Sequence, residues 1–260
     1  TYGGSCSSST TSAISGNNPI TLNSLSEGTY SNCTITVTDS LGHASSALSV
    51  STFVVDTTAP SVSSFTLSDT ELKAGDNATV TLVFSEAVAS FSSDDDITDP
   101  NGTLSAMTSA NNTNWTGTFT PAANTEDASN TLRLGTNYTD IAGNTGIDNT
   151  TSNYEVETLA PTANSFTLSD TALKAGDNAT VTLVFSEVVV DFSSVADITV
   201  DNGALPAMIS TDNRTWTGTF TPTADTEDAS NTLRLGTNYT DIAGNTGTDN
   251  TTSNYEVDTL

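Results

Sequence analysis

The chain has 260 residues, of which 31 are acidic and five are basic, so its formal net charge at pH 7 is −26. This balance excludes DNA, RNA and anionic membranes as expected partners, because each of them requires a positively charged protein surface. It favours a cation as the ligand, although a solvated acidic surface that keeps a monomer soluble has the same composition. No apolar run approaches the roughly 18 residues of a membrane-spanning helix, so we expect no membrane insertion of this segment.

The first unit, residues 1–58, contains both cysteines of the chain, Cys6 and Cys33. Such a pair predicts a disulfide in an extracellular module, and a free buried pair is the alternative. Asp39 and Gly42 precede a matching Asp and Gly of the next unit by 101 residues. We therefore expect residues 1–58 to be the later part of a domain.

Two full repeats follow, because residues 61–159 return as residues 162–260 without insertion or deletion. A period of 101 residues corresponds to a whole domain rather than to one turn of a solenoid. The junctions are marked by VDTTAP at 55–60 and by VETLAP at 156–161. The predicted domains are residues 59–159 and 160–260, joined to each other and to the first unit by short linkers.

Each repeat alternates short strand patterns with turn sequences. In residues 78–86, Val80, Leu82 and Phe84 alternate with residues of the opposite face, which is the period of a half-buried strand. In residues 114–121, Trp115 lies on the same predicted face as Gly117 and Phe119, and it is expected in the core. About seven strands per repeat, separated by turns rich in Gly, Asn and Asp, predict an all-β fold of two-sheet antiparallel sandwiches.

The motifs TLSD, LKAGDNATVTLVFSE, TWTGTFTP and YTDIAGN, together with the acidic-TxAP junction, resemble bacterial immunoglobulin-like repeats of giant type I-secreted adhesins, most closely those of the enterobacterial non-fimbrial adhesins. The resemblance implies tandem immunoglobulin-like β-sandwiches that form an extracellular rod with calcium at its junctions. It also implies that the whole adhesin is held at the bacterial surface and binds host cell-surface glycans or proteins, mainly through its distal end. The first unit resembles another subtype of these repeats.

Alternating strand direction predicts which acidic residues meet at each junction. The start of a domain, the loop after its second strand and the loop before its last strand share one pole, which faces the end of the preceding unit. Asp56 is therefore expected beside Glu86, Asp140 and Asn144. By the same construction, the second junction brings together Glu157, Glu187, Asp241 and Asn245.

Carboxylates that converge in this way repel one another unless a cation neutralises them. Ca²⁺ accepts six to eight oxygen ligands from carboxylates, carbonyls and water in irregular geometry. Zinc and copper are disfavoured because the two repeats have no histidine or cysteine, and magnesium is the weaker candidate. The alternative for Asp140 and Asp241 is that each only caps the backbone of its own D-x-x-G turn.

A second acidic group is expected at the opposite pole of each repeat. It could form another cation site near each junction, or its members could be ordinary turn residues. In the two repeats this group comprises Asp69, Asp76, Glu126 and Asp127, and Asp170, Asp177, Glu227 and Asp228.

No pattern in the chain predicts catalysis. The single histidine, His43, follows Gly42 in a predicted loop, and no serine or cysteine has a visible base partner. Carboxylates are abundant, but nothing selects the opposed pair that a glycosidase requires. We therefore expect a calcium-rigidified spacer in a secreted adhesin. The alternative is that these domains themselves bind glycans or host proteins.

Overall fold

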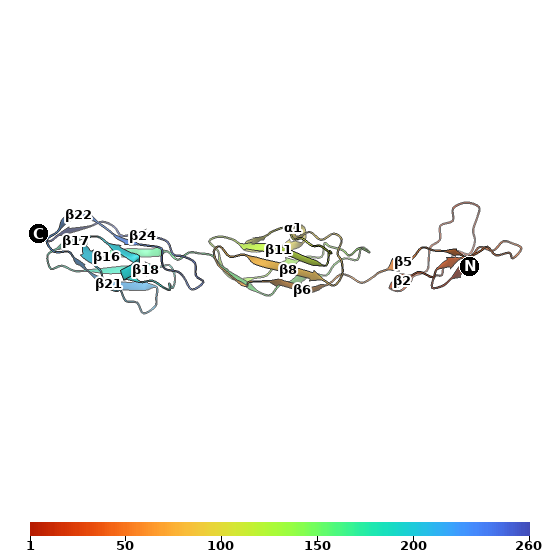
Figure 1. The fold of residues 1–260 in the computed structure, drawn as a ribbon, viewed down its shortest axis with the longest axis horizontal. Coiled ribbons are helices and arrows are strands. Elements are labelled where there is room, and N and C mark those ends of the chain that lie inside the picture. The colour runs from red at the N-terminus through yellow and green to blue at the C-terminus, as the bar shows by residue number, and fades with distance from the viewer.

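The computed structural model describes all residues from 1 to 260. Figure 1 shows three units placed end to end, with the N-terminus in a thin first unit and the C-terminus at the far end of the last sandwich. Strands are the main regular elements of the chain, and in the second and third units they form tandem β-sandwiches. The predicted all-β fold is confirmed.

The second unit contains one four-stranded sheet and two three-stranded sheets. The four-stranded sheet has the order β10-β11-β8-β6, and its strands are β6 (Val62–Leu67), β8 (Ala78–Phe84), β10 (Gly102–Leu104) and β11 (Asn114–Pro121). The facing sheets are formed by β7 (Glu71–Leu72), β12 (Glu126–Asn130) and β15 (Tyr154–Glu157), and by β9 (Ile97–Thr98), β13 (Arg133–Leu134) and β14 (Asn149–Thr150).

The core lies between these layers and follows the two-residue period of the strands. In β8 the side chains of Val80, Leu82 and Phe84 are buried, whereas the intervening residues are more exposed. In β11 Phe119 is fully buried and Trp115 packs against the core while remaining partly exposed. Seventeen buried side chains form one continuous cluster, so each sandwich has an independent core.

Two local features of the sandwich were not predicted. Strand β7 pairs with β15 in parallel, because the chain crosses from one sheet to the other after β6 without reversing its direction. The acidic run 94–96 forms most of α1 (Ser93–Asp96), a single helical turn in which Asp96 is buried and accepts a hydrogen bond from the backbone N–H of Ser92. That carboxylate is thereby engaged in shaping its own loop.

The third unit repeats this architecture and has its own cluster of seventeen buried side chains. Its four-stranded sheet contains β16 (Ala163–Leu168), β18 (Ala179–Phe185), β20 (Gly203–Ala204) and β21 (Thr215–Pro222). The remaining elements are β17 (Ala172–Lys174), α2 (Ser194–Asp197), β19 (Ile198–Val200), β22 (Glu227–Asn231), β23 (Leu233–Leu235), β24 (Asn250–Thr251) and β25 (Tyr255–Asp258). Neither four-residue helix of the chain approaches the length needed to cross a membrane.

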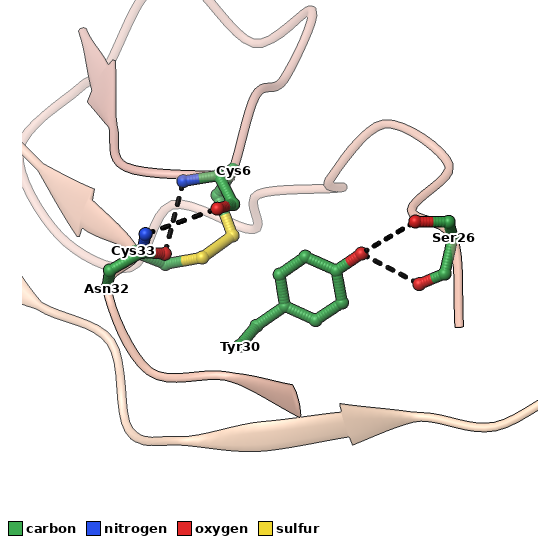
Figure 2. Close-up of a disulfide and its surroundings, with 6 residues drawn as sticks. Cys6, Ser26, Tyr30, Asn32 and Cys33 are labelled. Atoms are coloured by element: carbon green, nitrogen blue, oxygen red, sulfur yellow. Dashed lines mark hydrogen bonds between the residues drawn. A yellow bond between two sulfur atoms is a disulfide. The ribbon is translucent and has the colours of Figure 1, made fainter. Parts of the chain in front are cut away.

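The first unit has short strands and little core, since Cys6 and Cys33 are the only buried residues among residues 1–58. These cysteines form the predicted disulfide, and Figure 2 shows it beside paired hydrogen bonds between the Asn32 side chain and Ser5. On its other side the hydroxyl of Tyr30 donates to the backbone carbonyl of Ser26. The strands of this unit are β1 (Tyr2–Gly3), β2 (Gly28–Tyr30), β3 (Thr34–Ile35), β4 (Leu48–Ser49) and β5 (Phe53–Val55).

Candidate metal centres at the domain junctions

The first junction gathers three carboxylates from three separate segments. Asp56 follows the end of β5, Glu86 lies two residues after the end of β8, and Asp140 opens the loop 140–146. One carboxylate oxygen of each lies within 4.8 Å of the others. Strand direction thus places the linker acid of the first unit against two acids of the second unit.

Asp140 is held in place by its own loop. Its Oδ1 accepts hydrogen bonds from the backbone N–H groups of Gly143, at 2.7 Å, and Asn144, at 2.9 Å. Its Oδ2 accepts one from the side-chain amide of Asn144, at 2.7 Å. Burial alone would raise the pKa of Asp140, but these hydrogen bonds outweigh it and lower the pKa. Asp140 therefore remains ionised and fixed in orientation as the cap of its own turn, and this state also suits a cation ligand.

Asn144 connects this loop to the linker, because its amide nitrogen also donates to the backbone carbonyl of Asp56, at 3.2 Å. In this orientation Nδ2 faces the carboxylates of the cluster. Direct ligation of a cation by Oδ1 would require the amide group to flip. The structure thus brings Asn144 to the cluster, where its observed contacts position the carboxylates.

Glu86 accepts no hydrogen bond, unlike Asp140. Burial raises its pKa, and the negative charges of Asp56, Asp140 and Glu27 raise it further. A carboxylate that is desolvated beside like charges and has no compensating donor is stabilised most by a cation. Among the candidate ligands of the first cluster, Glu86 is therefore the carboxylate without a hydrogen bond of its own.

The second junction repeats the cluster with Glu157, Glu187 and Asp241, whose oxygens again lie within 4.8 Å of one another. Asn245 donates through Nδ2 to Oε2 of Glu157, at 2.6 Å, and to Oδ2 of Asp241, at 2.8 Å. Burial raises the pKa of Glu157 to about 7, and the proximity of Asp241 contributes to this shift. Burial followed by repulsion from Asp241 also raises the pKa of Glu187. Ionisation of Glu157 and Glu187 is thus less favourable than ionisation of exposed glutamates, because both are desolvated and lie beside Asp241.

The predicted second acidic group lies around the same junction. Asp69, Asp76 and Glu126 line a groove of about 940 Å³ that also contains Glu157 and Glu187. Asp69 and Asp76 each cap their own turn, by accepting from the backbone N–H groups of Glu71 and Lys73 respectively.

Asp127 does not line this groove. It accepts hydrogen bonds from the side chain of Asn101, at 2.8 Å, and the backbone N–H of Ser129, at 2.9 Å. The third unit has the same cap and amide contacts at its own C-terminal pole. There the corresponding residues are Asp170, Asp177, Glu227 and Asp228.

Four charged residues at the junctions were missed by the sequence reasoning. Glu71 and Glu155 are register partners in the parallel pair and line the 940 Å³ groove together with Lys73. At the first junction Glu27 lies immediately before β2, where it accepts a hydrogen bond from the hydroxyl of Thr58. It corresponds to Glu126, the first residue of β12, because β2 pairs with β5 as β12 pairs with β15. The spacing from Glu27 to the following strands differs from that in the repeats, so the sequence alone does not show this correspondence.

A family model for a bacterial Ig-like domain matches residues 56–156 and again residues 157–257. The chain belongs to the bacterial Ig-like domain family. Each match begins at the acidic residue that closes the preceding unit, Asp56 or Glu157. The family unit thus starts with the acid that approaches the cluster from the linker.

The chain has distant similarity to several solved structures. The chain is 15% identical to FdeC, an Escherichia coli adhesin, over 75% of this chain and 63% of that one, with a TM-score of 0.36. It is 18% identical to SGBP-B of the Bacteroides ovatus mixed-linkage glucan utilization locus over 95% of this chain and 58% of that one, with a TM-score of 0.21. It is 13% identical to domains 4–9 of the surface layer protein SbsC over 93% of this chain and 36% of that one, with a TM-score of 0.22. No curated protein matches the chain.

The donor set at both junctions of these bacterial Ig-like repeats fits calcium. Every candidate ligand atom is an oxygen, and three carboxylates converge within 4.8 Å at each site. Calcium tolerates such irregular oxygen sets and completes its coordination with carbonyls and water. The residues that would hold it are Asp56, Glu86 and Asp140 at the first junction, and Glu157, Glu187 and Asp241 at the second.

Proposed function

We propose that this chain is a calcium-stiffened spacer segment of a large secreted adhesin. The observation that supports the proposal most directly is that a linker carboxylate meets two carboxylates of the next domain at both junctions, each within 4.8 Å. The end-to-end arrangement of the units in Figure 1 suits a stalk that extends a distal binding region from a surface.

The stiffening follows from where the ligands come from. Asp56 belongs to the strand end of one unit, whereas Glu86 and Asp140 belong to loops of the next unit. A bound Ca²⁺ would offset two of the three negative charges of the cluster and would be a common partner for all three carboxylates. The linker would then be tied to the loop 140–146, which is itself held by the hydrogen bonds around Asp140, and bending at the junction would require breaking those contacts.

The location and partners of the whole protein belong to the same proposal. The disulfide between Cys6 and Cys33 is typical of an oxidising, extracellular environment and supports a location outside the cell. We propose in addition that the protein is secreted by a type I pathway and retained at the bacterial surface, as the resemblance to the giant non-fimbrial adhesins implies. The complete adhesin would attach to host cell-surface glycans or proteins, while this segment would contact neighbouring repeats.

Small-angle scattering of the 260-residue chain with Ca²⁺ and with a chelator tests the spacer function. We expect a longer maximum dimension and a narrower distance distribution with Ca²⁺, and magnesium at the same concentration is the control for ionic strength. An unchanged scattering profile would contradict calcium-dependent stiffening. Glycan binding by the same chain on an array would instead favour a role as a recognition module.

A further inference from the structure

The second junction contains a direct contact between neighbouring domains that the first junction lacks. The backbone N–H of Ala74, in the turn 73–76 of the second unit, donates to Oδ1 of Asn245 in the third unit, at 2.8 Å. The same turn places Nζ of Lys73 against Gly244, only 3.1 Å from where a Cβ of that residue would lie. Both contacts join the C-terminal pole of one repeat to the loop 241–245 of the next.

Asn245 uses its whole side-chain amide in this contact. Its Nδ2 donates to the backbone carbonyl of Glu157 and to the carboxylates of Glu157 and Asp241. Its Oδ1 accepts from Ala74. Since only an amide oxygen can accept from that N–H, the upstream turn determines which way the amide points. Asn245 is therefore a positioning residue that joins three segments, and Oδ1 is turned away from the acidic cluster.

The first junction is an internal comparison, because its loop is identical in sequence over TDIAGNTG. Gly143, the counterpart of Gly244, has no neighbouring atom within 4 Å of the position that a Cβ would take. Asn144 donates to Asp56 and Asp140, but no N–H of the first unit donates to its Oδ1. The difference arises from the upstream partner, since residues 1–58 contain no counterpart of the turn 73–76.

We infer that the turn 73–76 and the loop 241–245 form a docking surface between consecutive full repeats, which orients them before any cation binds. The ammonium group of Lys73 lies in the acidic groove of about 940 Å³ and partly compensates the charge there. The inference goes beyond the proposed function, because it concerns the contact that remains when calcium is removed. The equivalent turn of the third unit, 174–177, has the same form and fits the N-terminal pole of another repeat of this kind.

The turn allows a substitution that removes only the docking hydrogen bond. Asp76 donates its N–H to the carbonyl of Lys73, and Gly75 has φ of +89°, as in a type II turn. Proline is favoured at the position of Ala74 in such a turn and has no N–H. Ala74→Pro should therefore keep the turn and delete the donor. Ala175→Pro is the matched control, because it makes the same change in a turn without a downstream repeat.

The experiment measures interdomain distances by pulsed electron paramagnetic resonance in the 260-residue chain, in chelator. Spin labels on Thr118→Cys and Thr219→Cys report on the second junction, and labels on Thr29→Cys and Thr118→Cys report on the first; all three positions are exposed. We expect a narrow distribution of label-to-label distances across the second junction and a broad distribution across the first. Ala74→Pro should remove the narrow component, and Ala175→Pro should leave it unchanged.

Equal widths at the two junctions in chelator, or a narrow component that survives Ala74→Pro, would overturn the inference. Asn245→Ala provides a second variant if proline perturbs the turn, and it should have the same effect as Ala74→Pro. Repeating the measurement with Ca²⁺ separates this inference from the proposed function. If Ca²⁺ narrows the distance distribution at neither junction, the spacer mechanism alone is refuted. If both distributions are broad in chelator and Ca²⁺ narrows them equally, the docking surface alone is refuted.

Discussion

Substitution of Glu187 by glutamine tests the calcium clusters most cleanly. The carboxylate of Glu187 accepts no hydrogen bond in the structure, so the isosteric change to glutamine removes a charge of the cluster without removing a structural contact. The variant keeps an oxygen that can still bind a cation. We therefore expect the whole effect to come from electrostatics. Glu256→Gln, on an exposed position of β25, removes the same charge far from the junction and is the control.

The size of the effect follows from the attraction that the substitution removes. Attraction between Ca²⁺ and a carboxylate oxygen about 2.4 Å away is worth about 3.5 kcal/mol at the dielectric constant of water. The repulsions between Glu187 and the other two carboxylates of the cluster act with and without Ca²⁺, so their removal stabilises both states and leaves the affinity unchanged. The neutral oxygen of glutamine keeps part of the attraction, so the upper limit at this dielectric constant is about 3.5 kcal/mol, or roughly 400-fold weaker binding.

Calorimetric titration with Ca²⁺ should therefore show one class of site weakened by Glu187→Gln and no change with Glu256→Gln. In thermal unfolding, the effect of Glu187→Gln on the melting temperature should have opposite signs without and with Ca²⁺. In chelator, Glu187→Gln should raise the melting temperature slightly because repulsion is relieved, but with Ca²⁺ it should reduce the calcium-dependent rise. If Glu187→Gln and Glu256→Gln titrate alike, the three carboxylates do not form a cation site.

Three further predictions concern protonation, packing and the disulfide. The pKa of Glu157 is raised from 4.5 to about 7, so its ionisation should lower the stability of the metal-free junction as pH rises from 4.5 through 7. Because Ca²⁺ requires the ionised form, affinity should decrease as pH falls below 7, with proton release detectable by calorimetry in two buffers. Gly146→Ala would place a Cβ 2.2 Å from the buried ring of Tyr138 and should destabilise the second unit by about 1–3 kcal/mol in a denaturant titration. Gly135→Ala, whose Cβ would have an ordinary contact at 3.6 Å, is its control. Reduction of the disulfide should destabilise the first unit by about 2–5 kcal/mol and leave the unfolding transitions of the two repeats unchanged in calorimetry.

The sandwich fold could be predicted because its information is local. Alternation in segments such as 78–86 identifies the buried face, and the buried side chains of Val80, Leu82 and Phe84 confirm that face. Because the two repeats align without insertion or deletion, each assignment then transfers to the third unit. The parallel pairing of β7 could not be predicted in this way, because a two-residue strand has no period of its own and depends on where the chain changes sheets.

For the candidate site too, the sequence predicts one part and not another. Strand direction alone predicts which poles face each other, and the structure brings Asp56, Glu86 and Asp140 together as expected; binding of an ion there stays a prediction. The orientation of the Asn245 amide could not be predicted, because it depends on a backbone N–H that is 171 residues away in the chain. The orientation of such a side chain depends on contacts with the neighbouring domain, and the sequence of one repeat alone does not include those contacts.

The parallel pairing of β7 with β15 has a mechanical consequence for a stalk. The chain enters the second sandwich through β6 and β7 and leaves it through β15, so tension along the rod pulls the two paired strands in opposite directions. Their interstrand contacts, including the bond from the N–H of Glu155 to the carbonyl of Thr70, are then loaded in shear and must rupture together rather than one at a time. Resistance to forced extension is a kinetic property set by the barrier to unfolding, and this short pair of strands lies where that barrier is determined.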